Sequence, residues 1–125
     1  MKIARFEDIQ GWQEARKLSN MVYETIKKSE EFKRDFQLKG QATDAVVSTM
    51  FNIAEGFSRR SNKEFVQFLF ISKSSAAEIQ SLFYVALDQR YISQEIFQKI
   101  YDQAEKVAQL DSGFIKYLLG RTKNS

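Results

Sequence analysis

Glu55 and Arg59 are the side chains whose types and spacing come closest to a reactive arrangement, because a carboxylate and a guanidinium lie four positions apart. One interpretation is a carboxylate held by the guanidinium for catalysis. The other is a local ion pair across the end of a helix, worth about 0.2–0.5 kcal/mol. Isolated pairs of this kind are seldom catalytic, so we favour the local ion pair.

A basic cluster begins at the same place in the chain. Arg59, Arg60 and Lys63 surround Asn62, which we expect to cap the N-terminus of a helix. A helix N-terminus with cations around it attracts phosphate groups. A solvated surface that binds nothing has the same composition, however. The cluster therefore offers a nucleic-acid contact as one hypothesis and a solubilising end as the other.

The residues that usually carry catalysis or bind metals are missing. The chain has no His and no Cys, which removes the commonest general base, the commonest metal ligand and every thiolate. Ser74 and Ser75 lie in no nucleophile motif, and the sequence has no phosphate loop. We predict a protein that is not an enzyme, with no catalytic residue, no metal and no cofactor.

Apolar residues recur at spacings of three and four almost throughout, which predicts helices. The chain also has no Pro, so nothing interrupts a long helix. The charged segment 27–35 breaks the periodicity and is read as a connection. We expect four helices, at about 8–29, 38–55 and 62–90 and from Ser93 onward.

Short polar and glycine signals mark the ends of these helices. Gly56 suits the left-handed position that ends the second helix, and Ser93 suits the N-cap of the fourth. The predicted fold is all-α, an antiparallel up-down-up-down four-helix bundle, with residues 1–125 forming a single domain.

The second and third helices should form a hairpin about Arg60. Counting outward from that turn pairs Ser48 with about Ser72 to Ser74, so small residues face each other and the two helices should pack closely. Glu78 lies in the middle of the third helix and is expected to form a structural hydrogen bond, with Gln41 as its partner across the hairpin.

The net charge of +3 is predicted to be concentrated at one end of the bundle. In an up-down-up-down arrangement, both termini and the link between the second and third helices share that end. Eight basic and four acidic residues fall there, while the rest of the chain is close to neutral. The candidate nucleic-acid-binding residues are Arg59, Arg60, Lys63, Lys2, Arg5, Arg121 and Lys123.

Aromatic residues make up 14% of the chain, and several of them do not fit the core of a single four-helix bundle equally well. Some are expected to form an interface between copies, where aromatic residues are enriched. The residues in question are Phe51, Phe70, Tyr84, Tyr91, Phe97, Tyr101 and Tyr117. The N-terminus has no signal-peptide pattern and no apolar run is long enough to span a bilayer, so we expect a cytoplasmic protein with no membrane partner.

The first ninety or so residues resemble a known family. The residues that carry the resemblance are Phe6, Ile9, Trp12, Ala15, Arg16, Leu18, Gln41, Ser48, Asn52-Ile53-Ala54-Glu55-Gly56, Arg59, Glu64, Phe65, Phe68, Leu69, Ser74 and Glu78. They are similar to the four-helix-bundle proteins encoded in intervening sequences of bacterial 23S ribosomal RNA genes, also labelled the S23-type ribosomal protein family.

The resemblance implies an antiparallel four-helix bundle that assembles as a homo-oligomer, often a pentamer. It also implies similarity to basic bundles that bind nucleic acid and a reverse transcriptase. This chain is only mildly basic and has Ser74 where the family usually has Gly. Two functions therefore stay open: a bundle that binds RNA or DNA through its basic end, and a scaffold for a protein partner.

Overall fold

Helices account for almost all of the described chain, as the 3.6-residue periodicity predicts. The computed structural model describes residues 3–124, and the side chains of residues 3–121. No strand occurs in that part, so the all-α prediction is confirmed. The elements are the 3₁₀ helix η1 (Phe6–Asp8) and the α-helices α1 (Gln10–Lys28), α2 (Glu30–Arg34), α3 (Phe36–Phe57), α4 (Asn62–Asp88) and α5 (Gln94–Asn124).

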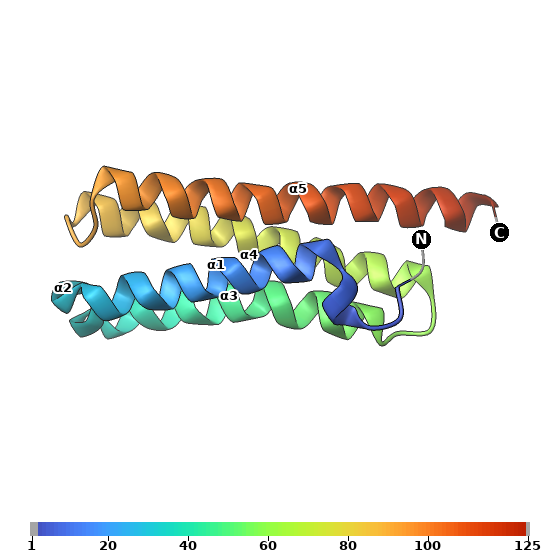
Figure 1. Ribbon diagram of the computed structural model, residues 1–125, viewed down its shortest axis with the longest axis horizontal. Coiled ribbons are helices and arrows are strands. Elements are labelled where there is room, and N and C mark those ends of the chain that lie inside the picture. The colour runs from blue at the N-terminus through green and yellow to red at the C-terminus, as the bar shows by residue number, and fades with distance from the viewer. Residues whose placement is uncertain (1–2, 125) are drawn as a thin grey trace.

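The four long helices lie side by side along one axis (Figure 1). Helix α1 packs against α3 and α5, and α4 also packs against α3 and α5. The last turn of α5 and the residues just before η1 lie at the same end as the link between α3 and α4 (Figure 1). Within residues 3–124 no helix is both long enough and apolar enough to cross a bilayer.

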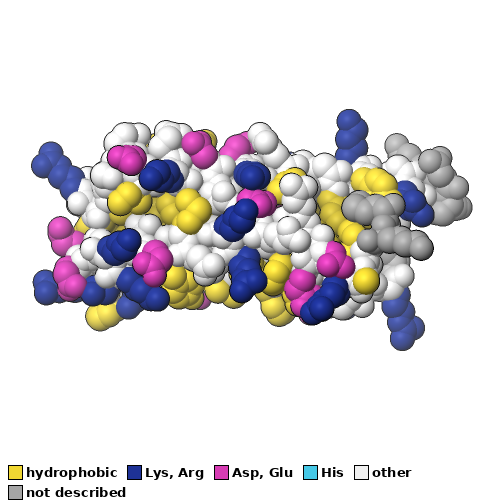
Figure 2. Space-filling model, viewed as in Figure 1, with side chains coloured by type: hydrophobic (Ala, Val, Ile, Leu, Met, Phe, Trp, Pro, Cys, Tyr) yellow, Lys and Arg dark blue, Asp and Glu magenta, His cyan; other side chains and the backbone are white. Residues whose placement is uncertain are grey.

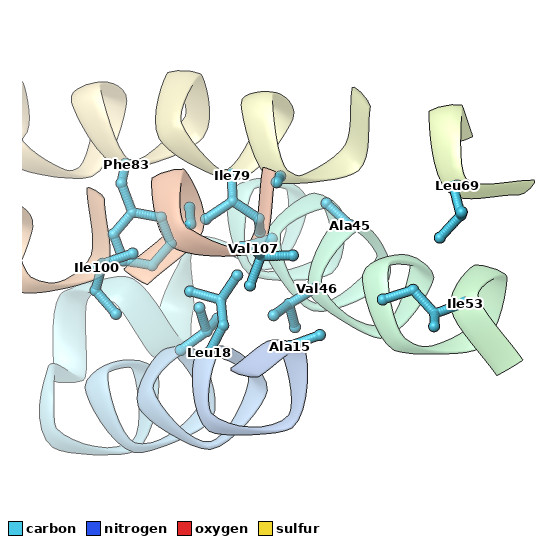
Figure 3. Packing of buried hydrophobic residues seen from close by; sticks show 14 of the residues in the cluster. Ala15, Leu18, Ala45, Val46, Ile53, Leu69, Ile79, Phe83, Ile100 and Val107 are labelled. Atoms are coloured by element: carbon cyan, nitrogen blue, oxygen red, sulfur yellow. The ribbon is translucent and has the colours of Figure 1, made fainter. Parts of the chain in front are cut away.

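The core runs along the centre of these helices. Its fully buried side chains include Leu18 of α1, Val46 of α3, Ile79 and Phe83 of α4, and Val107 of α5. Figure 3 shows side chains from all four long helices meeting in this interior. Burying a large apolar side chain stabilises a fold by about 1.5–3 kcal/mol. These core side chains therefore fix the positions of the helix ends and of the links between the helices.

The segment read as a connection contains an additional helix, α2. Ser29 Oγ accepts a hydrogen bond from Phe32 N at 3.2 Å, which caps α2, and Asp35 Oδ1 accepts one from Leu38 N at 3.0 Å, which caps α3. Phe32 is fully buried and its ring centroid lies 5.8 Å from that of Phe83. Phe32 is the single buried residue of α2, so the charged segment shows no apolar periodicity from which a helix could be predicted.

Two expectations about the α3–α4 link were wrong. Gly56 does not end α3 in a left-handed conformation, because the helix continues to Phe57 and no described glycine has a positive φ. Asn62 is not the cap of α4. Ser61 is the cap, its Oγ accepting a hydrogen bond from Glu64 N at 3.2 Å. The predicted cap at Ser93 is confirmed, since its Oγ accepts from Ile96 N at 3.2 Å.

The close packing predicted for the hairpin is confirmed, with a register one residue away from the expected one. The hydroxyl oxygens of Ser48 and Ser75 lie 2.8 Å apart, and Ser72 Oγ donates to Thr49 O at 3.0 Å. Ser74 is exposed instead. Small side chains thus let α3 and α4 approach along their middle turns.

Candidate anion-binding site

The link between α3 and α4 places two arginines at one end of the molecule. Ser58 N–H donates to the Ala54 and Glu55 carbonyls at 3.2 Å each, and Arg59 N–H donates to Gly56 O at 3.1 Å. These bonds tighten the last turn of α3, so Arg59 and Arg60 project from a short, constrained segment rather than from a free loop.

A surface hollow of about 270 Å³ lies beside this link. Arg59, Arg60 and Arg121 border it, so the link and the C-terminal part of α5 both contribute arginine residues. The other side chains around it are Ile3, Phe57, Ser61, Asn62, Phe65, Phe114, Tyr117 and Leu118. The hollow therefore combines three cations with apolar and aromatic walls.

The aromatic walls form a continuous series of ring contacts. The ring centroids of Phe57 and Phe65 are 6.2 Å apart, those of Phe65 and Phe114 are 5.1 Å apart, and those of Phe114 and Tyr117 are 6.1 Å apart. Because these rings come from α3, α4 and α5, they hold the ends of three helices together. The hollow is thus built on a packed support.

The three arginines differ in how far they are already engaged. Arg59 Nη2 lies 3.7 Å from Glu55 Oε1, and its guanidinium lies 4.7 Å from the ring centroid of Phe68. Arg121 Nη1 donates to the Tyr117 hydroxyl at 3.2 Å. Arg60 has no ion pair or hydrogen bond with any residue between 3 and 121. Arg60 is therefore the guanidinium most available to an anion.

The N-terminus of α4 opens on the same hollow through Ser61 and Asn62. The first turn of a long helix carries a partial positive charge, and its free N–H groups favour anions. Glu64, in that first turn, hydrogen-bonds to Ser61 and reduces this field.

The structure brings only part of the predicted binding set together. Lys63 is exposed in the first turn of α4 and does not border the hollow. Arg5 is paired with Glu7, with 2.6 Å between Nη2 and Oε2. Lys2 and the side chain of Lys123 lie outside the described residues. Figure 2 shows Lys and Arg side chains along the whole visible face, with acidic ones among them.

The motif residues of the resemblance act as the framework of this link. Asn52 Nδ2 donates to Ser48 O at 2.8 Å and to Ser48 Oγ at 2.9 Å, beside the contact with Ser75. Ser58 Oγ donates to Glu55 Oε2 at 3.0 Å. Gly56 is buried because Phe65 of α4 packs directly on it. These contacts fix the end of α3 against α4.

The hydrogen bond expected between Gln41 and Glu78 is absent from the described part of the chain, and that prediction was wrong. Both side chains are exposed to solvent. Glu78 has no structural role that the geometry displays.

Two buried acids escaped the sequence reasoning. Glu14 is 6% exposed; Gln103 Nε2 lies 3.1 Å from its Oε1, Lys17 Nζ 3.1 Å from its Oε2 and Lys106 Nζ 3.2 Å from its Oε1. These contacts, with the Gln103 hydrogen bond the strongest, lower the pKa of Glu14 to about 2. The second acid, Asp111, has the opposite environment.

Asp111 is 1% exposed, and its Oδ2 has no hydrogen-bond partner among the described residues. Burial raises the pKa of Asp111 to about 7, against smaller lowering effects from Ser72 and Lys73. Its position was a usable signal, because it falls in the apolar series Ile100, Ala104, Val107, Asp111, Ile115 and Leu118. Among residues 3–121, no three acidic side chains come close enough together to hold a metal ion.

Comparison with known proteins gives one family and one fold. A family model described as 23S rRNA-intervening sequence protein matches residues 7–113. Among solved structures, the chain is similar to a protein of unknown function from the S23 ribosomal protein family of Bacteroides thetaiotaomicron, with a TM-score of 0.77 and 20% identity, covering 85% of this chain and 95% of that one. This similarity supports the fold alone. No curated protein matches the chain.

Proposed function

Because the chain belongs to the 23S rRNA-intervening sequence protein family, whose model matches residues 7–113, we propose that it is a non-enzymatic protein that binds RNA or DNA. The hollow bordered by Arg59, Arg60 and Arg121 receives a backbone phosphate. The antiparallel four-helix bundle serves as the rigid scaffold of that contact, and the protein works in the cytoplasm.

One observation carries this proposal: three arginine residues from two distant parts of the sequence border one hollow. Guanidinium presents a planar fork of N–H donors that matches the oxygens of a phosphate. Phosphate contacts supply most of the sequence-independent affinity for nucleic acid. Arg60, which lacks a partner within residues 3–121, leads this contact, and Arg59 and Arg121 reinforce it.

Assembly of several copies belongs to the same proposal, with a pentamer implied by the family resemblance. The support is apolar surface that the single chain leaves exposed: Phe36 is 76% exposed and Phe51 is 60% exposed, both on α3, and Tyr84 of α4 is 50% exposed. Of the aromatic residues expected at an interface, Phe97 is instead buried in the core. Repeating a weak phosphate contact around a ring would raise the overall affinity.

Fluorescence anisotropy with labelled RNA and duplex DNA across a salt series tests the phosphate contact. Arg60→Gln should weaken binding several-fold for every sequence and reduce the magnitude of the salt slope by about one unit. Arg34→Gln is the matched control, since Arg34 is exposed on α2 at the other end of the molecule. Equal affinities for the two variants would contradict the proposal.

The alternative function is a scaffold that binds a protein and no nucleic acid. The exposed side chains Phe51, Phe70 and Ile71 favour it, since they lie on the outer surfaces of α3 and α4. This function predicts one stoichiometric partner from nuclease-treated lysate that is retained by Arg60→Gln and lost by Phe51→Gln. Loss of that partner in Arg60→Gln alone would count against the scaffold.

A further inference from the structure

A second hollow, of about 460 Å³, adjoins the one bordered by the arginines. Ile3, Phe114 and Tyr117 line both, so the two hollows share a wall. Figure 2 shows hydrophobic side chains reaching the surface at this end of the molecule beside Lys and Arg. One compartment is thus cationic and its neighbour is mainly apolar.

The second hollow combines apolar walls with a few polar groups. Ile9 and Leu110 line it together with the shared aromatic residues, and Gln10 and Gln109 also border it. Asp8 also borders it, and its Oδ2 accepts a hydrogen bond from Arg5 N at 3.3 Å. Apolar and aromatic walls bordered by polar residues suit a nucleobase, whose faces stack on such walls and whose edges form hydrogen bonds.

We propose that the two hollows together hold one unpaired nucleotide of a single-stranded polynucleotide. The phosphate lies beside Arg59, Arg60 and Arg121, and the attached base enters the hollow lined by Leu110 and Phe114. This inference rests on the proposed nucleic-acid function and adds a preference for single strands. A base within a duplex is stacked and paired, so it would have to leave the helix before it could enter.

The chain supplies a substitution that fills the second hollow without disturbing the fold. Gly113 borders this hollow, and a Cβ placed on it would meet nothing within 4 Å. Gly113→Leu therefore introduces bulk where the base would lie. Gly120 is also in α5, also has no atom within 4 Å of an added Cβ, and borders neither hollow. Gly120→Leu is the matched control, and both changes favour the helix.

The experiment measures the affinity of the unmodified protein and both variants for a single strand and for the duplex of the same sequence, as RNA and as DNA. The unmodified protein should prefer the single strand. Gly113→Leu should weaken single-strand binding about tenfold, as expected for the loss of one base contact, and leave duplex binding unchanged. Gly120→Leu should match the unmodified protein, and circular dichroism should show equal helicity for all three.

The remaining outcomes separate this inference from the function on which it rests. Equal affinity for single strand and duplex, with no effect of Gly113→Leu, would overturn the unpaired-nucleotide site and leave the phosphate contact standing. Equal weakening of both by Gly113→Leu would also overturn it. Absence of binding to either polymer at low salt would remove both proposals together.

Discussion

A Cβ placed on Gly56 would lie 2.7 Å from Cδ1 of Phe65 and 2.8 Å from Cβ of Phe68, closer than any real Cβ contact. Both phenylalanines belong to α4 and pack on the end of α3, next to the α3–α4 link that carries Arg59 and Arg60. Glycine is required there because two helices approach too closely for any side chain, and the residue keeps a normal helical conformation.

Gly56→Ala should therefore destabilise the protein. The expected loss is about 1–3 kcal/mol, the usual cost of overpacking a core, despite the better helix propensity of Ala. Urea denaturation at 25 °C measures it. Gly40→Ala on the same helix is the control, because an added Cβ there meets nothing within 4 Å and should stabilise by up to about 1 kcal/mol. Equal stabilisation by both would contradict the close approach.

The contact between Ser48 and Ser75 should show energetic coupling. Ser48→Ala removes a hydroxyl that contacts both Ser75 Oγ and Asn52 Nδ2, so we expect a loss of about 1 kcal/mol. In a double-mutant cycle, Ser75→Ala should cost less once Ser48→Ala is present, with a coupling of about 0.5 kcal/mol or more. Ser74→Ala, at an exposed neighbour, should show no coupling with Ser48. If the effects of Ser48→Ala and Ser75→Ala on the unfolding free energy were strictly additive, the contact between the two hydroxyls would contribute nothing to stability.

Asp111 should make the protein less stable as the pH rises. Its pKa is raised from the ordinary 3.8 to about 7 in the folded protein, so between these values the folded state holds a proton that the unfolded state has released. The stabilising effect of that proton is complete below pH 3.8 and is lost as the pH rises through 7. Asp111→Asn should remove this slope and raise the unfolding free energy at pH 8.

Thermal or urea unfolding from pH 4 to pH 8 measures the slope for Asp111. Each unit of pKa shift corresponds to about 1.4 kcal/mol, which sets the scale of the effect. Asp44→Asn provides the comparison, because Asp44 is exposed on the same bundle and its substitution should leave the slope in place. If Asp111→Asn and Asp44→Asn gave parallel curves, the buried carboxyl would not be the titrating group.

Glu14 should act in the opposite direction, in a more acidic range. Its pKa falls from the ordinary 4.5 to about 2, so its contribution to stability is present above pH 4.5 and is lost as the pH falls through 2. Glu14→Gln should cost about 1–2 kcal/mol at pH 7 and less at pH 3.

The comparison for Glu14 is an exposed ion pair. Glu95 Oε1 lies 3.4 Å from Lys99 Nζ, and both side chains are mostly exposed. Glu95→Gln should therefore lower the unfolding free energy by less than about 1 kcal/mol. Chemical denaturation of both variants at pH 7 and pH 3 distinguishes the two cases. A cost for Glu14→Gln that did not change between these pH values would contradict the lowered pKa.

The parts of the structure that depend on one helix at a time could be predicted from the sequence. The spacing of Trp12, Ala15, Leu18, Val22 and Ile26 predicts the buried face of α1; the last four are buried and Trp12 is partly buried against the core. Ser93 was recognisable as a cap because its signal is local. The basic run at Arg59 and Arg60 next to a helix start is likewise visible without tertiary information, and its binding role stays a prediction.

The parts that depend on contacts between helices could not be predicted. A glycine that ends a helix and a glycine that admits a neighbouring ring look alike locally, so Gly56 was assigned the wrong reason. Arg121 was included for its charge, but its position beside Arg60 depends on how α5 packs against α4. Counting residues from the turn paired Glu78 with Gln41, but both lie on exposed faces of their helices, which counting alone does not reveal.

The hollow bordered by Arg59, Arg60 and Arg121 is formed by the α3–α4 link together with the C-terminal part of α5, which is distant in sequence. No segment of the chain that ends before α5 can form it, however well α1, α3 and α4 have folded. During translation the site therefore does not exist until α5 has emerged from the exit tunnel and docked. A nascent chain lacking that helix would lack the hollow, and with it the phosphate contact proposed above.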